Sequence, residues 1–261
     1  MSTNLVLRIN GARAELILTP PEGRPPTFDH AALDQLDAQL SVLETVADDQ
    51  SVRVVFVRSA SPRFFCVGAD INALRHLDAA SVVPWVEHGH RVFNRLESLP
   101  VPVIARVEGY ALGGGLELAL AADLILATPA AQLAQTEAKL GFVAGWGGSW
   151  RLPQRVGAAR AKEMFFTGRM LTAAEAVAVG LVDECVAPEA LDARCDQLAR
   201  DIGDSAPLAV RELKRLVAQA PELAREDSAA AEAAASSACV QSPETQRRVS
   251  AFLEKRKKPA T

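Results

Sequence analysis

Three short apolar runs, separated by helix-like segments, constrain the fold of this chain most strongly. The runs VRVVFVRSA, VPVIARVEG and DLILAT occupy residues 52–60, 101–109 and 123–128. Continuous apolar runs of this length are typical of strands that are buried on both faces. Amphipathic segments, which predict helices, cover 30–47 and 82–99. Strands that alternate with helices predict an α/β core.

The two ends of the chain differ from this central pattern. The first 18 residues alternate apolar and polar side chains like a single strand. From about residue 158 the sequence is rich in helix formers: AARAKEMFFTG, then TAAEAVAVG with Gly180 as a cap, then two longer predicted helices. We therefore predict a main α/β domain over 1–198 and a helical region over 199–261.

Composition excludes several classes of protein. The chain has 261 residues, is 49% hydrophobic and 23% charged, and has a net charge of −4, which fits a globular protein and argues against binding to nucleic acid. Its four cysteines lack the C-x-x-C spacing of a zinc site. The N-terminus lacks the pattern of a signal peptide, and the apolar stretch 111–127 is too short and too charged to span a membrane. We expect a cytoplasmic protein without a metal site.

The segment GYALGGGLELALAADL, residues 109–124, carries the first candidate site. Three consecutive glycines let the backbone reach positive φ and let another group approach closely, and a helix that begins there directs free N–H groups at that group. The segment matches neither a P-loop nor a complete G-x-G-x-x-G, because Leu118 occupies the last position. An oxyanion-binding turn is expected. Taken alone, Glu117 is equally well explained as a carboxylate that stabilises the helix start by about 0.3–1 kcal/mol.

A second glycine-containing turn, FFCVGADI at 64–71, also follows a predicted strand and precedes a predicted helix, 71–77. Asp70 could cap that helix. Two turns at strand ends can present two backbone N–H groups to one oxygen, which is the arrangement of an oxyanion hole.

These segments, taken in order, resemble the enoyl-CoA hydratase/isomerase, or crotonase, family. The resemblance runs from about residue 5 to about residue 258 and rests on FFCVGADI, PVPVIARVEGYALGGGLELALAADL, AQLAQTEAKLG, GWGGSWRLPQRVG, TGRMLTAAEAVAVGLVDECV and FLEKRK. It implies a spiral of ββα units and a C-terminal helical region that mediates trimerisation, often as a dimer of trimers. It also implies an acyl-CoA thioester as substrate.

The resemblance implies roles for four residues. The N–H groups of Ala69 and Gly114 would hold the thioester oxygen. Glu117 would activate water and Glu137, 20 residues later, would donate a proton, and the two could share the water so closely that their titrations are coupled. Related isomerases often keep only one of these acids, so the pair favours hydration. No metal or redox cofactor is implied, although in isolation Glu137 is better explained as a solvated loop carboxylate.

Further substrate contacts are implied by position. Basic residues in the early loop and before the first oxyanion turn would bind CoA phosphates, and two tail residues match positions that reach CoA on a neighbouring subunit. The implied contacts are Arg24, Arg63, Val67, Asp70, Ile71, Phe252 and Lys255.

The chain departs from the family pattern mainly in GFVAGWGGSW, residues 141–150, where Ala144 replaces a proline and two tryptophans are added. Trp146 and Trp150 could both pack in the core or a trimer contact, or Trp146 could narrow the acyl pocket. In addition, Asp29 stands where asparagine is usual, and Thr136 replaces the proline of a Q-P-E segment.

The favoured function is an enoyl-CoA hydratase. Two alternatives remain at this level. One is another reaction on the same scaffold, such as isomerisation, decarboxylation or hydrolysis of an acyl-CoA. The other is a CoA-binding protein without activity.

Overall fold

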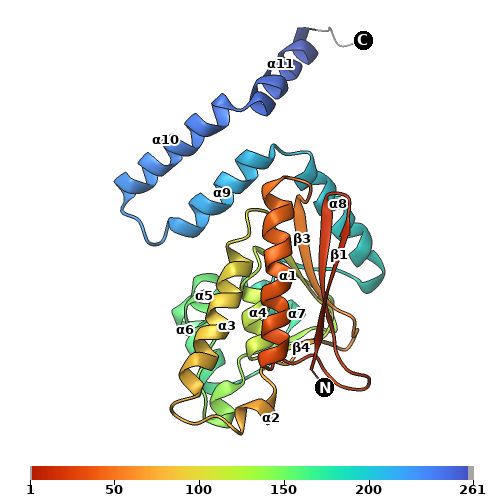
Figure 1. Ribbon diagram of the computed structural model, residues 1–261, viewed down its shortest axis with the longest axis vertical. Coiled ribbons are helices and arrows are strands. Elements are labelled where there is room, and N and C mark those ends of the chain that lie inside the picture. The colour runs from red at the N-terminus through yellow and green to blue at the C-terminus, as the bar shows by residue number, and fades with distance from the viewer. Residues whose placement is uncertain (1, 258–261) are drawn as a thin grey trace. The chain divides into compact units, whose positions relative to one another are not determined.

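Two sheets with surrounding helices form the first part of the chain (Figure 1). The computed structural model describes residues 2–257, and for 255–257 only the backbone. The strands are β1 (Asn4–Asn10), β2 (Arg13–Thr19), β3 (Val54–Ser59), β4 (Phe64–Cys66), β5 (Val103–Val107), β6 (Tyr110–Leu112), β7 (Leu124–Ala127), β8 (Gln132–Ala134), β9 (Leu171–Thr172) and β10 (Glu184–Cys185). The helices up to residue 203 are α1 (His30–Asp48), α2 (Ile71–Leu74), α3 (Val82–Glu97), α4 (Gly114–Leu120), η1 (Glu137–Leu140), α5 (Gly148–Val156), α6 (Ala158–Thr167), α7 (Ala173–Ala178), η2 (Pro188–Ala190) and α8 (Leu191–Gly203).

The order of strands shows how the chain winds. One sheet has the order β1-β2-β3-β5-β7-β10 and the other β4-β6-β8-β9. Within them β2, β3, β5, β7 and β10 are parallel, as are β4, β6 and β8. The pairs β3/β4, β5/β6 and β7/β8 therefore each give one strand to each sheet, and a helix follows each pair. This repeated ββα winding confirms the predicted α/β class.

The three predicted strands are present as β3, β5 and β7, but the second is shorter than expected. β5 ends at Val107, and the chain turns at Gly109 into β6 of the other sheet. A Cβ at Gly109 would lie 1.9 Å from the carbonyl oxygen of Arg63, so only glycine permits this approach.

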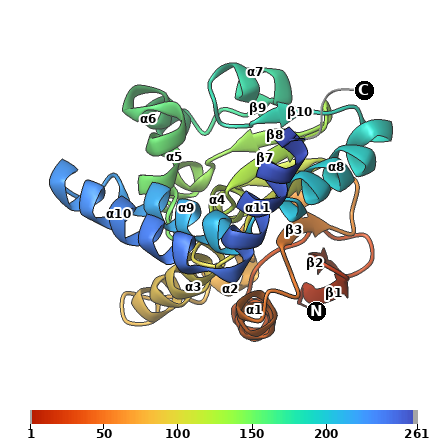
Figure 2. The ribbon, with the colours of Figure 1, turned by 90° about the horizontal axis from the view of Figure 1, so that it is seen from above.

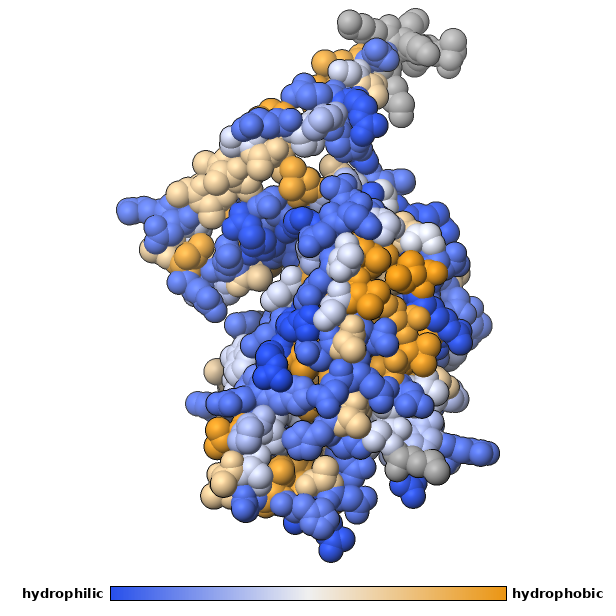
Figure 3. Space-filling view, viewed as in Figure 1, coloured by the Kyte–Doolittle hydropathy of each residue, from blue (hydrophilic) through white to orange (hydrophobic). Residues whose placement is uncertain are grey.

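The prediction of one N-terminal strand was wrong. β1 and β2 form an antiparallel hairpin in which Asn10 pairs with Arg13, and Gly11 in the turn between them has φ 56°. The period of two continues through both strands, so alternation alone does not reveal the reversal. Figure 3 shows apolar surface beside α1, over this hairpin. Val6 and Ile9 of β1 are among the exposed apolar side chains of the hairpin.

Helices α1 and α3 lie side by side against the core (Figures 1 and 2). α1 begins at Asp29, whose side chain accepts a hydrogen bond from the Ala32 N–H at 2.8 Å, so the residue in the asparagine position serves as an N-cap. The predicted leucine face of α1 is buried: Leu33, Leu36, Leu40 and Leu43. α2, at four residues, is shorter than the predicted 71–77.

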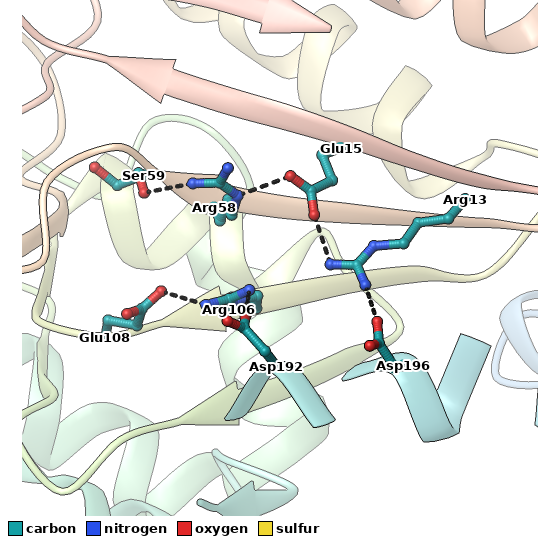
Figure 4. A network of polar contacts seen from close by, with 8 residues as sticks. All are labelled: Arg13, Glu15, Arg58, Ser59, Arg106, Glu108, Asp192 and Asp196. Carbon is teal, nitrogen blue, oxygen red and sulfur yellow. Dashed lines mark hydrogen bonds and ion pairs between the residues drawn. The ribbon is translucent and has the colours of Figure 1, made fainter. Parts of the chain in front are cut away.

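A network of ion pairs ties α8 to the six-stranded sheet (Figure 4). Arg13 of β2 pairs with Asp196, and Arg106 of β5 pairs with Asp192 at 2.7 Å. Glu15 bridges Arg13 and Arg58. Each arginine of the network therefore has at least one carboxylate partner.

The chain divides by internal contacts into residues 1–199 and 200–261. The second part contains α9 (Pro207–Gln219), α10 (Arg225–Gln241) and α11 (Pro243–Lys257) after the end of α8. Four helices therefore occupy 191–257 where two were predicted, because Pro207 and Pro243 start new helices in a continuously helix-forming composition. Between residues 2 and 257, no helix combines the length and apolar character needed to cross a membrane.

Candidate active site

A cavity of about 290 Å³ opens where three parallel strands end. β4, β6 and β8 are followed by the segments 67–69, 113–114 and 136–137, and all three segments line it. Ligands commonly bind at the carboxyl ends of parallel strands, because loops there can converge on one point. The lining residues are Val67, Gly68, Ala69, Ile71, Leu74, Val82, Trp85, Val86, Leu112, Gly113, Gly114, Glu117, Thr136, Glu137, Leu140, Phe142, Val143, Gly145 and Trp146.

The two glycine turns meet at this cavity. Gly68 has φ 92° and Gly113 has φ 53° with ψ −125°, conformations that favour glycine. A Cβ at Gly68 would lie 2.9 Å from the Gly114 nitrogen, so the turns are in direct contact. Within residues 2–257, the N–H groups of Ala69 and Gly114 donate to no other group. Both remain available to an oxygen in the cavity.

Glu117 lies in the first turn of α4 and is 1% exposed. The Trp146 and Gly148 N–H groups both donate to its Oε1 atom, each at 2.7 Å. Burial raises the pKa of Glu117, while these N–H donors and the charge of Arg151 favour the carboxylate. The same side chain lines the cavity, so this turn holds a carboxyl group that the cavity can reach.

Glu137 begins η1, and the structure brings it to the same cavity as Glu117. Burial, followed by the negative charge of Glu117, raises the pKa of Glu137 to about 7. Near neutral pH this carboxyl therefore exists in both protonation states. The position is not the solvated loop that Glu137 suggests in isolation.

Gln135 lies in one of the segments that resemble the family, but no role was expected for it. Its side chain is fully buried, and its amide, with the nitrogen turned toward Glu137, donates to Oε1 at 3.0 Å and to Oε2 at 2.9 Å. It orients the second carboxyl. The signal in the sequence was a glutamine two residues before the predicted acid, because a glutamine that becomes buried there needs a hydrogen-bond partner.

Trp146 packs in the core, as one interpretation expected, and it also lines the cavity. It is 3% exposed, and its ring centroid lies 5.4 Å from those of Trp85 and Phe93. Its six-membered ring packs on Gly114, where a Cβ would lie 2.6 Å from Cζ3. Trp150 is 41% exposed, stacks on His90 at 5.0 Å and does not line the cavity.

Of the other residues predicted to contact the substrate, only some line the cavity. Val67 and Ile71 line the cavity, whereas Asp70 does not and instead caps α2 by accepting from the Asn72 N–H at 2.7 Å. Arg24 and Arg63 are exposed and lie outside the cavity lining. Phe252 is exposed on α11, and the Lys255 side chain lies outside the described residues.

Two further residues were missed because only tertiary contacts reveal them. Gly89 of α3 makes room for Trp146: a Cβ there would lie 2.0 Å from the indole Nε1. Arg151 of α5 is 2% exposed and donates to the Trp146 carbonyl at 2.9 Å. Gly89 stands in no sequence pattern that indicates a site, and Arg151 lies in GWGGSWRLPQRVG, where no role was expected for it.

Comparison with known proteins agrees with this geometry. The family model described as enoyl-CoA hydratase/isomerase matches residues 26–260. The chain is 32% identical to the short-chain-enoyl-CoA hydratase of Clostridium acetobutylicum, covering 97% of this chain and 96% of that protein. It is 36% identical to the mitochondrial methylglutaconyl-CoA hydratase of Rattus norvegicus, covering 82% and 69%. The crystal structure of an enoyl-CoA hydratase from Bacillus anthracis matches with a TM-score of 0.89 at 30% identity, covering 97% and 96%.

Proposed function

The chain belongs to the enoyl-CoA hydratase/isomerase family, and on that premise we propose that it adds water to a trans-2-enoyl-CoA to give a 3-hydroxyacyl-CoA. One observation carries the proposal: two carboxyl groups and two unengaged backbone N–H groups line the same cavity. A hydration needs both an acid and a base, whereas holding CoA needs neither.

In the proposed reaction the thioester oxygen accepts hydrogen bonds from the Ala69 and Gly114 N–H groups. Negative charge develops on this oxygen when water attacks C3 of the double bond. Donors that are already fixed in a buried site can lower such a barrier by several kcal/mol. The glycines at 68 and 113 support this role, because their positive φ angles bring the two turns together.

The two glutamates carry the protons. Glu117, as the carboxylate, accepts a proton from water at Oε2 while the hydroxyl bonds to C3. Glu137, in its protonated form, delivers a proton to C2. The cycle ends with a protonated Glu117 and an ionised Glu137, which exchange a proton through solvent. The raised pKa of Glu137, about 7, suits a proton donor at neutral pH.

The walls of the cavity favour an uncharged acyl group. Its charged lining residues are the two glutamates, and no Lys, Arg or His among residues 2–254, whose side chains are described, lines it. A distal carboxylate on the acyl group would meet apolar side chains such as Leu140, Phe142 and Val143 and would be left unpaired. We therefore propose an apolar enoyl group in place of the carboxylated methylglutaconyl group that one relative's name denotes.

The remaining features of the proposal follow the family. Arg24, Arg63, Phe252 and Lys255 are proposed to contact CoA, the last two from a neighbouring subunit of a trimer or a dimer of trimers. The proposed steps are proton transfers and C–O bond formation, so no metal or redox cofactor is required, and activity should survive EDTA.

A panel of acyl-CoA thioesters tests the function. Loss of enoyl absorbance and formation of a 3-hydroxyacyl-CoA are expected for crotonyl-CoA and longer apolar enoyl-CoAs, with a much smaller kcat/KM for 3-methylglutaconyl-CoA. No hydration of any chain length by folded protein that binds CoA contradicts the proposal. Mass spectrometry separates the alternative reactions, since a shifted double bond indicates isomerisation and free CoA indicates hydrolysis.

A further inference from the structure

Arg151 is a buried cation that lies behind the cavity and does not line it. Its Nη2 atom donates to Asn94 Oδ1 and to Glu97 Oε2, each at 2.6 Å. Its Nη1 atom donates to the Trp146 carbonyl at 2.9 Å. Because a guanidinium is costly to bury without partners, these bonds fix it firmly. α3 thus anchors Arg151, and Arg151 in turn holds the backbone at Trp146.

That backbone is the turn that binds Glu117. The Trp146 and Gly148 N–H groups point to Glu117 Oε1, and the carbonyl of Trp146, which lies between them in the chain, points to Arg151. Gly147 has φ 108°, and a Cβ there would lie 1.9 Å from Arg151 Nη1. The guanidinium therefore packs directly on the glycine, and the conformation of the turn depends on it.

The charge of Arg151 acts in the same direction. It favours the ionised form of Glu117, whereas burial of Glu117 opposes ionisation. The other titratable groups that face this pair are Glu137 from η1, and Glu97 and His90 from α3. Of these, Glu97 pairs with Arg151 itself, and His90 has a lowered pKa through burial and then through the charge of Arg151.

We propose that Arg151 is a positioning residue for the hydration: it holds the 145–148 turn so that Glu117 Oε1 stays bound and Oε2 faces the reacting water. The inference rests on the proposed function for one point, the role of Glu117 as the base that activates water. The link between Arg151 and Glu117 is a property of the folded chain and is measurable without turnover.

Three variants test it: Arg151→Gln, Arg151→Lys and the matched control Arg155→Gln. Arg155 lies one turn later on α5 and binds Asp183 and the Asp123 carbonyl, away from the cavity. Arg151→Gln removes the charge and the forked donor. Arg151→Lys keeps the charge but cannot bond both α3 and the turn with the same geometry.

The first readout is independent of catalysis. The infrared band of the protonated Glu117 carboxyl, assigned by its loss in Glu117→Gln, is titrated against pH. We expect its midpoint to rise by about one pH unit in Arg151→Gln, less in Arg151→Lys, and not at all in Arg155→Gln. An unchanged midpoint in folded Arg151→Gln overturns the proposal. If that variant does not fold, an unchanged midpoint and kcat in Arg151→Lys overturn it.

The second readout is the division between kcat and KM on the best enoyl-CoA. We expect kcat to fall by about 10- to 100-fold in Arg151→Gln with little change in KM, and Arg151→Lys to recover part of kcat. A loss of kcat no larger than that of Arg155→Gln overturns the role. If the wild-type chain hydrates no substrate, the proposed function fails, while the infrared titration still decides the role of Arg151.

Discussion

At the scale of single residues, the site depends on how differently its two carboxyl groups are held. Glu117 has one oxygen bound by two N–H groups, whereas Glu137 is oriented by the Gln135 amide. The surroundings of Glu137 raise its pKa to about 7, partly through the charge of Glu117. Two acids in one cavity can take different roles when their environments differ in this way.

Replacing each glutamate by glutamine tests those roles. Glu117→Gln and Glu137→Gln keep the size of the side chain but remove its ability to exchange a proton. We expect kcat for enoyl-CoA hydration to fall by about 10²- to 10⁴-fold in each. Calorimetric titration with a CoA thioester should show nearly unchanged affinity. Wild-type rates in either variant would remove that residue from the mechanism.

Glu137 also predicts a dependence of stability on pH. Its folded-state pKa of about 7 exceeds its ordinary value of 4.5, so folding favours the protonated form. The stability that this preference contributes is complete below about pH 4.5 and is lost as pH rises through about 7. Glu137→Gln should therefore be more stable than wild type at pH 8, by about 1–3 kcal/mol, with the difference declining toward pH 5.

Urea unfolding at pH 5 and at pH 8 measures this difference. Glu163→Gln is a suitable control, because Glu163 lies at the surface and its hydrogen bonds to Arg160 and Arg169 lower its pKa. An advantage of Glu137→Gln that is equal at both pH values would show that the pKa of Glu137 is not raised in the folded state.

At the scale of elements, the position of α3 relative to the turn before α5 depends on Gly89. A glycine in the middle of a helix costs about 1 kcal/mol relative to alanine. Here it leaves room for the Trp146 indole, which forms one wall of the cavity. The cost in helix stability thus permits close packing between α3 and the tryptophan that lines the cavity.

Gly89→Ala should destabilise the chain despite its better helix propensity. The new Cβ would lie 2.0 Å from Trp146 Nε1, and such overpacking costs about 1–3 kcal/mol. The cost should largely disappear when Trp146→Phe is combined with it, which a double-mutant cycle of unfolding free energies measures.

The control for this cycle is Gly203→Ala at the end of α8, where a Cβ meets no atom within 4 Å. That substitution should be neutral or stabilising. If Gly89→Ala behaves like Gly203→Ala, the indole does not depend on the glycine.

At the scale of the whole molecule, the helices of residues 200–257 leave many apolar side chains uncovered. Leu213 and Val217, four residues apart on one face of α9, are 60% and 73% exposed. Val240, Val249 and Leu253 are also more than half exposed. Apolar surface of this kind is typical of an interface between subunits.

The homotrimer or dimer of trimers proposed above from the family would have a mass three or six times the 27.8 kDa of the chain. Leu213→Asp combined with Val217→Asp should dissociate it, because charges would have to be buried at the contact. Sedimentation velocity measures the mass. Val42→Asp, at an apolar side chain of α1 that is 46% exposed, is the matched control and should leave the assembly intact.

The amino-acid sequence by itself was sufficient to predict the α/β class, the strands β3, β5 and β7, the leucine face of α1 and the two glycine turns. Each of these depends on local periodicity or on a glycine-rich stretch, which are visible in the chain. The predictions of a single N-terminal strand and of two long C-terminal helices were wrong, because a strand pattern or a helical composition can continue across a turn.

Only the tertiary structure decided how the site is held together. Glu117 is bound by a turn about 30 residues later, Trp146 fits against Gly89 of another helix, and Arg151 joins α3 to that turn. Such contacts join residues that are distant along the chain, so they leave no periodic signal in it. The sequence determined which groups are present, and packing determined which of them meet and which Glu117 oxygen the 145–148 turn holds.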